Sequence, residues 1–187
     1  LQDVVQREVD IAVRMAQPSQ DALVARRIGD VELGLFARAD YVERHGTPAT
    51  LAELARHALI GFDQLTPFLR EAGKAFPVWR REAFALRADS DLAQLALLRA
   101  GCGIGFCQTV IARRDPLVRV LPKAVSLKFP TWVVMHEDLR GSLRCTVTFD
   151  ALARALKSYV SGTDVARASP PSRSAKKSTN TRSRDGM

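Results

Sequence analysis

The sequence predicts an α/β fold in two lobes, on three observations. Hydrophobic residues make up 47% of the 187 residues, which is enough for a packed core. The apolar set is mainly Leu, Val and Ala with only 6% aromatic residues, a composition typical of compact α/β proteins. Helix-like and strand-like patterns alternate along the chain, the order expected for helices packed on a mainly parallel sheet.

The first elements follow from hydrophobic periodicity. Residues 1–8 resemble the last turns of a helix, and residues 9–13 are predicted to be a buried strand. A period of two over residues 31–37 predicts another strand. Asp40 can cap a short helix that ends at Gly46. Since a complete domain rarely begins within a helix, we expect a further strand and helix upstream.

Capping residues mark the middle of the chain. Thr50 and Glu53 have the spacing of a capping box, which predicts a helix that leads into a short strand over residues 58–62. Residues 84–88 are again strand-like.

A strongly apolar helix is predicted over residues 92–100, after a cap at Asp89 and Ser90. Because it is apolar on nearly every side except at Gln94 and Arg99, we expect it to be buried. The three glycines that follow it predict a tight turn in which the backbone approaches its neighbours closely: Gly101, Gly103 and Gly105.

The last predicted elements are a strand over residues 131–135 and a helix. One face of that helix carries apolar residues at helical spacing: Cys145, Phe149, Leu152, Leu156 and Tyr159.

From Gly162 the chain is rich in Ser, Pro and basic residues, which predicts a disordered tail over residues 162–187. Its six Lys or Arg and two Asp account for half of the net charge of +8. The tail is either a solubilising extension or a source of salt-dependent affinity for nucleic acid.

Composition also excludes several classes of protein. No stretch of about 20 apolar residues occurs, so no membrane span is predicted. The first residues lack the basic, apolar and small-residue pattern of a secretory leader. Three cysteines, an odd and sparse number, suit a reducing compartment, so we expect a cytoplasmic protein.

The motifs do not indicate enzyme or metal chemistry. The glycine run at 101–105 follows a helix and precedes a strand, the reverse of a nucleotide-binding loop. Cys102 and Cys107 lack a second pair at ligand spacing, so we assign no metal. No signature joins the three histidines to a nucleophile, so we expect no catalytic residue and no cofactor. A thiol enzyme that uses Cys107 is a rival hypothesis.

Two places suit an anion. Arg14 follows the first predicted strand at its carboxyl end, where side chains overhang the crevice of an α/β sheet, so it can bind a carboxylate. It can equally be a surface arginine. The helix start at Asp89, Ser90 and Asp91 also follows a predicted strand, and it is either an anion-binding helix N-terminus or a plain cap.

Five segments together resemble the sensing domain of LysR-type transcriptional regulators. They run in the family's order and cover nearly all of the predicted ordered chain: VDIAVRM at 9–15, VELGLFARADYVERHGTPATLAELARHALIGF at 31–62, DSDLAQLALLRAGCGIGFCQ at 89–108, ARRDPLVRVLP at 112–122 and TWVVMHEDLRGSLRCTVTFDALARAL at 131–156. The resemblance implies a type 2 periplasmic-binding-protein-like fold, in which crossing strands join two α/β lobes and a small-molecule effector binds between them.

By that template, residues 1–35 plus 131–161 form the first lobe and residues 36–130 the second. The first lobe is incomplete, because the family's first strand and helix are absent from these residues. The residues that the resemblance places in the effector cleft are Arg14, Met15, Phe62, Asp63, Asp89, Ser90 and Met135.

The resemblance also implies partners. We expect a small, anionic effector, a homodimer or homotetramer, no membrane, and DNA contact only through an N-terminal winged helix-turn-helix that these residues lack. The alternative is an extracytoplasmic solute-binding protein of the same fold, which would carry a leader. Because an absent first strand leaves a sheet edge and apolar surface uncovered, we also expect marginal stability or self-association.

One position departs from the family pattern. Many relatives have Pro directly after the glycine turn, where this chain has Gln108. Glutamine retains a backbone N–H and adds a polar side chain, so the effector cannot be inferred from other members.

Overall fold

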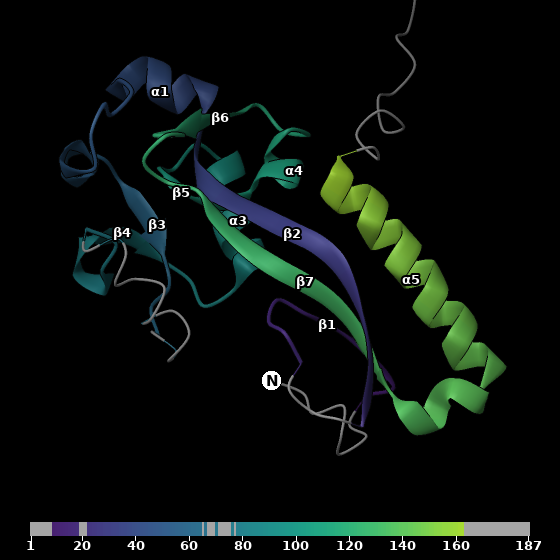
Figure 1. The fold of residues 1–187 in the computed structure, drawn as a ribbon. Helices are drawn as coiled ribbons and strands as arrows, with labels where there is room; N and C mark the ends of the chain where they lie inside the picture. Colours follow the sequence, from purple (N-terminus) through teal and green to yellow (C-terminus); the bar gives the residue numbers. More distant parts are fainter. Residues whose placement is uncertain are drawn as a thin grey trace, which may run out of the picture.

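Two long antiparallel strands, β2 (Leu23–Arg38) and β7 (Leu127–His136), run side by side through the middle of the molecule (Figure 1). The structure is a computed structural model. It describes residues 9–18, 22–64, 66, 70, 76 and 78–162. The predicted helix at 1–8 and nearly all of the predicted tail lie outside the described residues.

The strands beside this pair are also antiparallel. β1 (Ile11–Arg14) pairs with β7, while β5 (Gly105–Gln108) and β6 (Leu117–Val120) pair with the second half of β2. β5 and β6 oppose the same β2 residues, Leu35 and Phe36, so they lie on opposite edges of β2.

The prediction of a mainly parallel sheet is therefore wrong. In the described part of the chain, parallel pairing is found between β3 (Leu59–Gly61) and β4 (Phe84–Arg87) and at the bridge from Leu59 to Ile104. The alternation of helices and strands along the chain does not by itself determine strand direction, which depends on how the connections cross the sheet. Here β2 lies between β5 and β6 and runs antiparallel to both.

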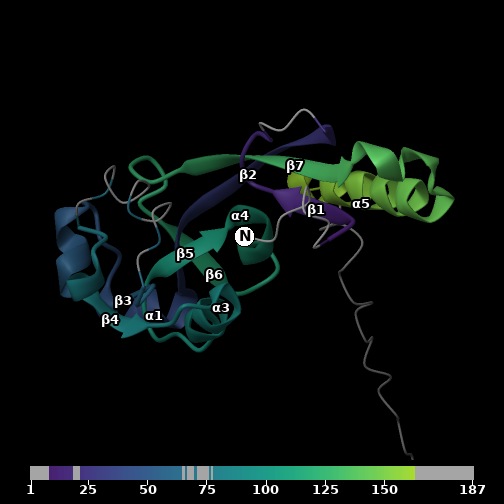
Figure 2. The same ribbon diagram turned by 90° about the horizontal axis from the view of Figure 1, so that it is seen from below.

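Two packing regions lie toward opposite ends of the long pair (Figure 2). One contains β1 and α5 (Leu143–Ser161), and its buried residues are Ile28, Val133, Met135, Phe149 and Ala153. The other contains β3 to β6 and the elements α1 (Ala39–His45), η1 (Ala52–Arg56), η2 (Arg81–Ala83), α3 (Asp91–Arg99) and α4 (Thr109–Ala112). η3 (Glu137–Gly141) links β7 to α5. The apolar face predicted for the last helix is confirmed, since Cys145 and Phe149 are buried and Leu152 and Leu156 pack against the same buried cluster as Phe149.

The helix starts follow the predictions in part. Ser90 caps α3, because its Oγ accepts the Ala93 N–H at 3.4 Å. Asp40 lies inside the first turn of α1 and forms an ion pair with Arg38 instead of capping, so that prediction is wrong.

The element predicted after Thr50 is a 3-10 helix of five residues. The Glu53 N–H donates to Thr50 Oγ1 at 3.4 Å, as in a capping box. The Glu53 carboxylate, however, accepts the N–H of Ala49 at 2.9 Å.

α3 is less buried than its composition predicts. Leu92 is 78% exposed, while the polar Gln94 is only 5% exposed. The Gln94 amide compensates for its burial by donating through Nε2 to Ala88 O at 2.7 Å. The prediction of an all-round buried helix is thus wrong, because the hydrogen bond at the end of β4 decides which face of α3 turns inward.

Candidate functional site

The parallel strands β3 and β4 end at the same edge, where two loops are joined through one carboxylate. Asp89 Oδ1 accepts the backbone N–H of Asp63 at 2.9 Å and that of Gln64 at 2.8 Å. The Ala88 N–H also donates to Gly61 O at 3.0 Å. Asp89 therefore holds the segment after β3 against the segment that begins α3.

Two arginines surround Asp63 at this edge. Arg81 Nη2 lies 2.7 Å from Asp63 Oδ1, and Arg81 Nε donates to Asp63 O at 2.9 Å. Arg87 Nε lies 3.4 Å from the same carboxylate oxygen. Each guanidinium has five N–H donors, and these bonds use only some of them. Both side chains are about two-fifths exposed, at 43% and 40%, so their remaining donors can hold a ligand oxyanion.

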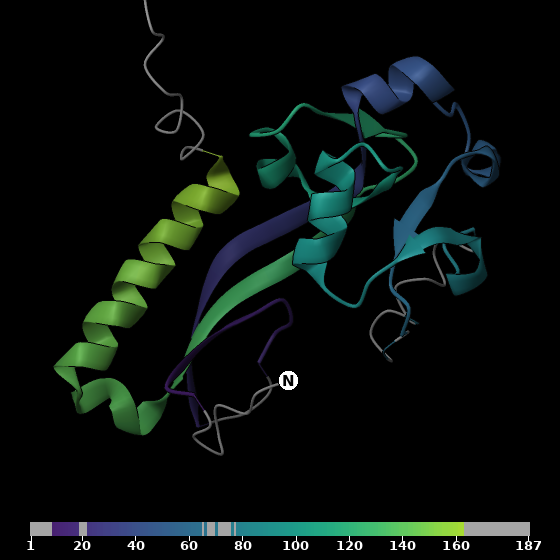
Figure 3. The same ribbon diagram turned by 180° about the vertical axis from the view of Figure 1, so that it is seen from behind.

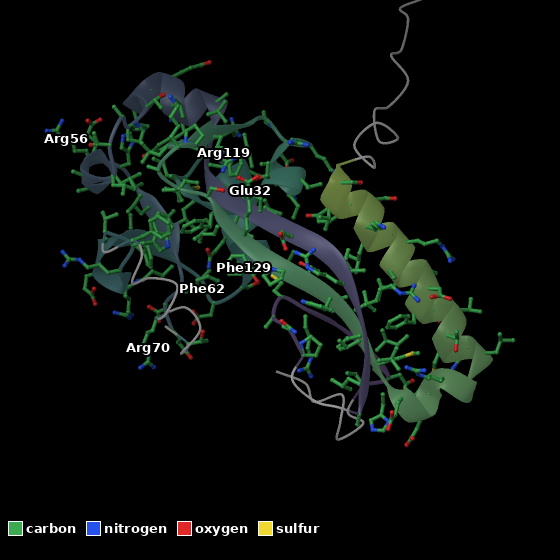
Figure 4. The ribbon with its side chains drawn as sticks, in the orientation of Figure 1. Glu32, Arg56, Phe62, Arg70, Arg119 and Phe129 are labelled. Atoms are coloured by element: carbon green, nitrogen blue, oxygen red, sulfur yellow. The ribbon has the colours of Figure 1, made fainter. Side chains whose placement is uncertain are left out.

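Ser90 and Phe62 flank the same edge. Ser90 is exposed, and its hydroxyl serves as the N-cap of α3. Phe62 directly follows β3 and is half-buried, and in the view of Figure 4 it is labelled between the β3–β4 pair and the long strands. The structure thus brings together four of the seven predicted residues: Phe62, Asp63, Asp89 and Ser90.

Arg14 and Met15 lie on a different element. Arg14 is the last residue of β1 and opposes Trp132 of β7, so the predicted strand extends one residue further than its pattern indicated. Met15 follows directly and is 39% exposed. These two residues are therefore positioned by the edge of the long sheet.

Met135 has a different environment from the other predicted residues. It is 3% exposed and packs in the buried cluster with Phe149 and Val133 beneath α5. Its side chain contributes to the core in this structure.

Sequence reasoning missed Arg81 and Arg87. The only signal was their position, because Arg81 precedes the strand-like segment at 84–88 and Arg87 lies near its end. Their contact with Asp63 depends on how the intervening chain folds back, and periodicity contains no information on that.

A nucleophilic thiol at Cys107 does not fit the structure. The side chain is 6% exposed, and burial, assisted by the Asp115 carboxylate, raises the pKa of the thiol to about 11. It is therefore protonated near neutral pH, where a nucleophile has to be a thiolate. In the part of the chain that the structure describes, no three His, Cys, Asp or Glu side chains gather as metal ligands would.

Comparison with protein families gives one match that covers most of the chain. The family model described as "LysR substrate binding domain" matches residues 1–157. Among curated proteins, the HTH-type transcriptional regulator CrgA of Neisseria meningitidis serogroup C (strain 8013) is 28% identical over 168 residues. The alignment covers 86% of this chain and 56% of CrgA, so the chain spans just over half the length of this relative.

Solved structures agree with this match. The CrgA regulatory domain from Neisseria meningitidis superposes with a TM-score of 0.67 at 26% identity, covering 82% of this chain and 78% of that one. The regulatory domain of AphB from Vibrio vulnificus, treated with cumene hydroperoxide, gives a TM-score of 0.62 at 19% identity over the same shares. The second likeness concerns the fold alone. Together they identify the architecture as the type 2 periplasmic-binding-protein-like fold of such regulatory domains.

Proposed function

The chain belongs to the LysR substrate-binding domain family, and we propose that it is the effector-sensing part of a DNA-binding transcriptional regulator. The match over residues 1–157 is the observation that carries this proposal, because it includes every described strand and nearly all of α5. Members of the family are regulators and not enzymes, which agrees with the protonated, buried thiol of Cys107.

We propose that the effector binds between two lobes, residues 1–35 plus 131–161 and residues 36–130. The support is that two separate elements, the β3–β4 edge and the end of β1, present arginines and exposed polar groups. Guanidinium groups at both places favour a small organic anion. The residues proposed to line the site are Arg14, Met15, Phe62, Asp63, Arg81, Arg87, Asp89 and Ser90. Met135 is left out, because it is buried under α5.

Movement between the lobes is the proposed signal. β2 and β7 connect the two packing regions, and the register of β2 against β7 shifts between Arg27 and Gly29. A bulge locally bends a strand and increases its twist. An effector that contacts both lobes would therefore favour one angle of this bent pair over another, which is a shift between existing conformations.

DNA binding, assembly and location are proposed for the whole regulator. CrgA is named an HTH-type regulator, and this chain corresponds to just over half of its length. We therefore assign DNA reading to a segment outside these residues, and we expect homo-oligomers that act in the cytoplasm. No helix in the described part of the chain combines the length and apolar character that a membrane span requires. The alternative, an extracytoplasmic solute-binding protein, is not favoured, since the matched proteins are transcriptional regulators.

The coding sequence upstream of Leu1 gives the first test. We expect it to encode a winged helix-turn-helix followed by a linker helix. A secretory leader in that position would instead support the solute-binding alternative and overturn the proposal.

Binding by the cleft is tested on the chain itself. A panel of small organic acids is screened by thermal shift, and any acid that raises the Tm is titrated by calorimetry against Arg87→Gln and against Arg154→Gln. Arg154 is an exposed residue of α5, away from β4, and serves as the matched control. Loss of a charge-assisted hydrogen bond predicts about tenfold or more weaker binding to Arg87→Gln only. If both substitutions weaken binding of the acid equally, or if neither weakens it, the proposed effector cleft is wrong.

A further inference from the structure

A pocket of about 240 Å³ lies away from the proposed cleft. Its wall is formed by residues 30–32 of β2, by Lys128 of β7, by α4 with Arg113, and by the last two residues of α5. None of the residues proposed for the effector cleft lines it. Figure 3 shows the C-terminal end of α5, in yellow, beside α4, so the pocket lies where the two packing regions meet behind the long strands.

The two acidic residues of the wall are already neutralised. Asp30 accepts a hydrogen bond from Arg27 Nη2 at 2.7 Å. Glu32 is bound by Arg119 Nη2 at 2.5 Å, a pair labelled in Figure 4, and by Ser126 Oγ at 2.8 Å. The Arg119 hydrogen bond holds the pKa of Glu32 below its usual value, so this carboxylate stays ionised and paired.

The two basic residues of the wall are in the opposite situation. Neither Arg113 nor Lys128 has a carboxylate within ion-pair distance among the residues that the structure describes. Lys128 acts on Glu32 only through the longer-range field that lowers the pKa of that carboxyl. The pocket wall therefore carries two exposed cations that form no ion pair with any carboxylate of the described residues.

The rest of the wall combines one polar group with apolar surface. Thr109 Oγ1 is buried and has no hydrogen-bond partner in the described part of the chain. Because this oxygen has almost no accessible surface, a ligand in the pocket would not reach it and would bind through Arg113 and Lys128 instead. Three valines, Val31, Val110 and Val160, supply apolar surface.

We propose that this pocket is a second ligand site, which binds a small organic monocarboxylate through Arg113 and Lys128. A guanidinium and an ammonium together select an oxyanion. The two cations alone would also attract phosphate, and the apolar surface beside them is what favours an organic monocarboxylate over inorganic phosphate. The valines suit a short apolar body, and the volume limits the ligand to a small one.

A ligand at this site would affect how α5 packs on the bend of β2. Gly29 has φ +149°, and a Cβ at this position would lie 2.9 Å from Val160 Cγ1, so only glycine lets α5 pack this closely on the bend of β2. A ligand held between α4, β2 and the end of α5 would stabilise that packing. This step rests on the proposed effector cleft. A ligand in this pocket would favour one of the two lobe angles, so its binding would change the affinity of the cleft for the effector.

Calorimetry on the 187-residue chain tests the site with 4-hydroxybenzoate as the monocarboxylate and inorganic phosphate as the alternative oxyanion. Two single substitutions address this pocket: Arg113→Gln and Lys128→Gln. Arg87→Gln addresses the proposed cleft, and Arg154→Gln is the surface control. Circular dichroism and the Tm of each variant verify that it folds.

We expect 4-hydroxybenzoate to bind at millimolar concentration or better, and Arg113→Gln and Lys128→Gln each to weaken it by about tenfold. Arg87→Gln and Arg154→Gln should leave this binding unchanged. Failure of the cleft would leave this result intact, so the two proposals fail separately. Three outcomes overturn the second site: no binding of 4-hydroxybenzoate, binding that depends on Arg87 and not on Arg113, or phosphate binding more tightly at Arg113 than the monocarboxylate.

Discussion

The phenol of Tyr159 donates a 2.6 Å hydrogen bond to Oε1 of Gln108. This bond joins the last turn of α5 to the end of β5, two elements from different packing regions. Arg114 lies over the Tyr159 ring, with its guanidinium carbon 6.0 Å from the centroid. A proline at position 108 would provide no amide oxygen for this bond. The chain therefore has a direct polar link behind its crossing strands.

Removing either partner of this link should lower stability. We expect Tyr159→Phe and Gln108→Ala each to reduce the free energy of unfolding by about 1 kcal/mol, the typical net value of one hydrogen bond. The double variant should lose clearly less than the two single losses combined, because the second substitution finds the bond already broken. Urea unfolding of the four proteins measures this, and strictly additive losses would show that the bond contributes nothing.

Alkaline pH should destabilise the protein through Cys107. Its pKa is raised from 9.0 to about 11, mainly by burial. Since the folded pKa lies above the unfolded one, the stabilisation is complete below pH 9 and is lost as the pH rises to about 11. A shift of this size corresponds to about 2 to 3 kcal/mol.

The Cys107→Ala variant isolates this contribution. Its free energy of unfolding should fall less steeply between pH 9 and 11 than that of the native chain. Burial also raises the pKa of Tyr159, and the charge of Cys107 raises it further, so both proteins are compared in a Tyr159→Phe background, which removes this second group. Parallel curves for the two proteins across this window would show that the Cys107 pKa is not raised by folding.

The carboxylate of Asp89 should be needed to join the β3 and β4 ends. Asp89→Ala removes the acceptor of two backbone N–H groups, those of Asp63 and Gln64. Because this edge is open to water, we expect a loss near the low end of the range for unpaired groups, about 1 kcal/mol. We also expect faster amide hydrogen exchange at residues 63 and 64. Asp91→Ala, in the first turn of the same helix, is the control and should leave exchange at these two amides unchanged.

A methyl group at position 103 should disrupt the glycine turn. A Cβ on Gly103 would lie 2.3 Å from the carbonyl oxygen of Ala58, which accepts the Ile104 N–H at 2.8 Å. Gly103→Ala must therefore move backbone, and we expect it to cost about 2 kcal/mol or more. Gly141→Ala meets no atom within 4 Å and should change stability by less than about 0.5 kcal/mol. Thermal unfolding compares the two, and equal Tm values would refute the steric argument.

Part of the candidate site could be predicted from the sequence. The pattern of a strand-like segment followed by capping residues pointed to Asp89 and Ser90, while Asp63 was placed in the cleft by the resemblance to LysR-type sensing domains. Arg81 and Arg87 were missed because their contacts with Asp63 arise from a return of the chain that no local pattern encodes. The burial of Met135 depends on which face of β7 the last helix covers.

The sequence by itself located several helices and strands, although only the second half of β2 (Leu23–Arg38), and indicated to which family the chain belongs. The predicted strand at 131–135 falls within β7 and the predicted helix at 92–100 nearly coincides with α3, because the spacing of apolar residues is a local signal. Only the tertiary structure decided that β2 lies between β5 and β6, and that Gln94 turns inward while Leu92 faces solvent. Strand direction and the buried face of a helix depend on hydrogen bonds and packing between residues far apart in the chain, and periodicity does not report these.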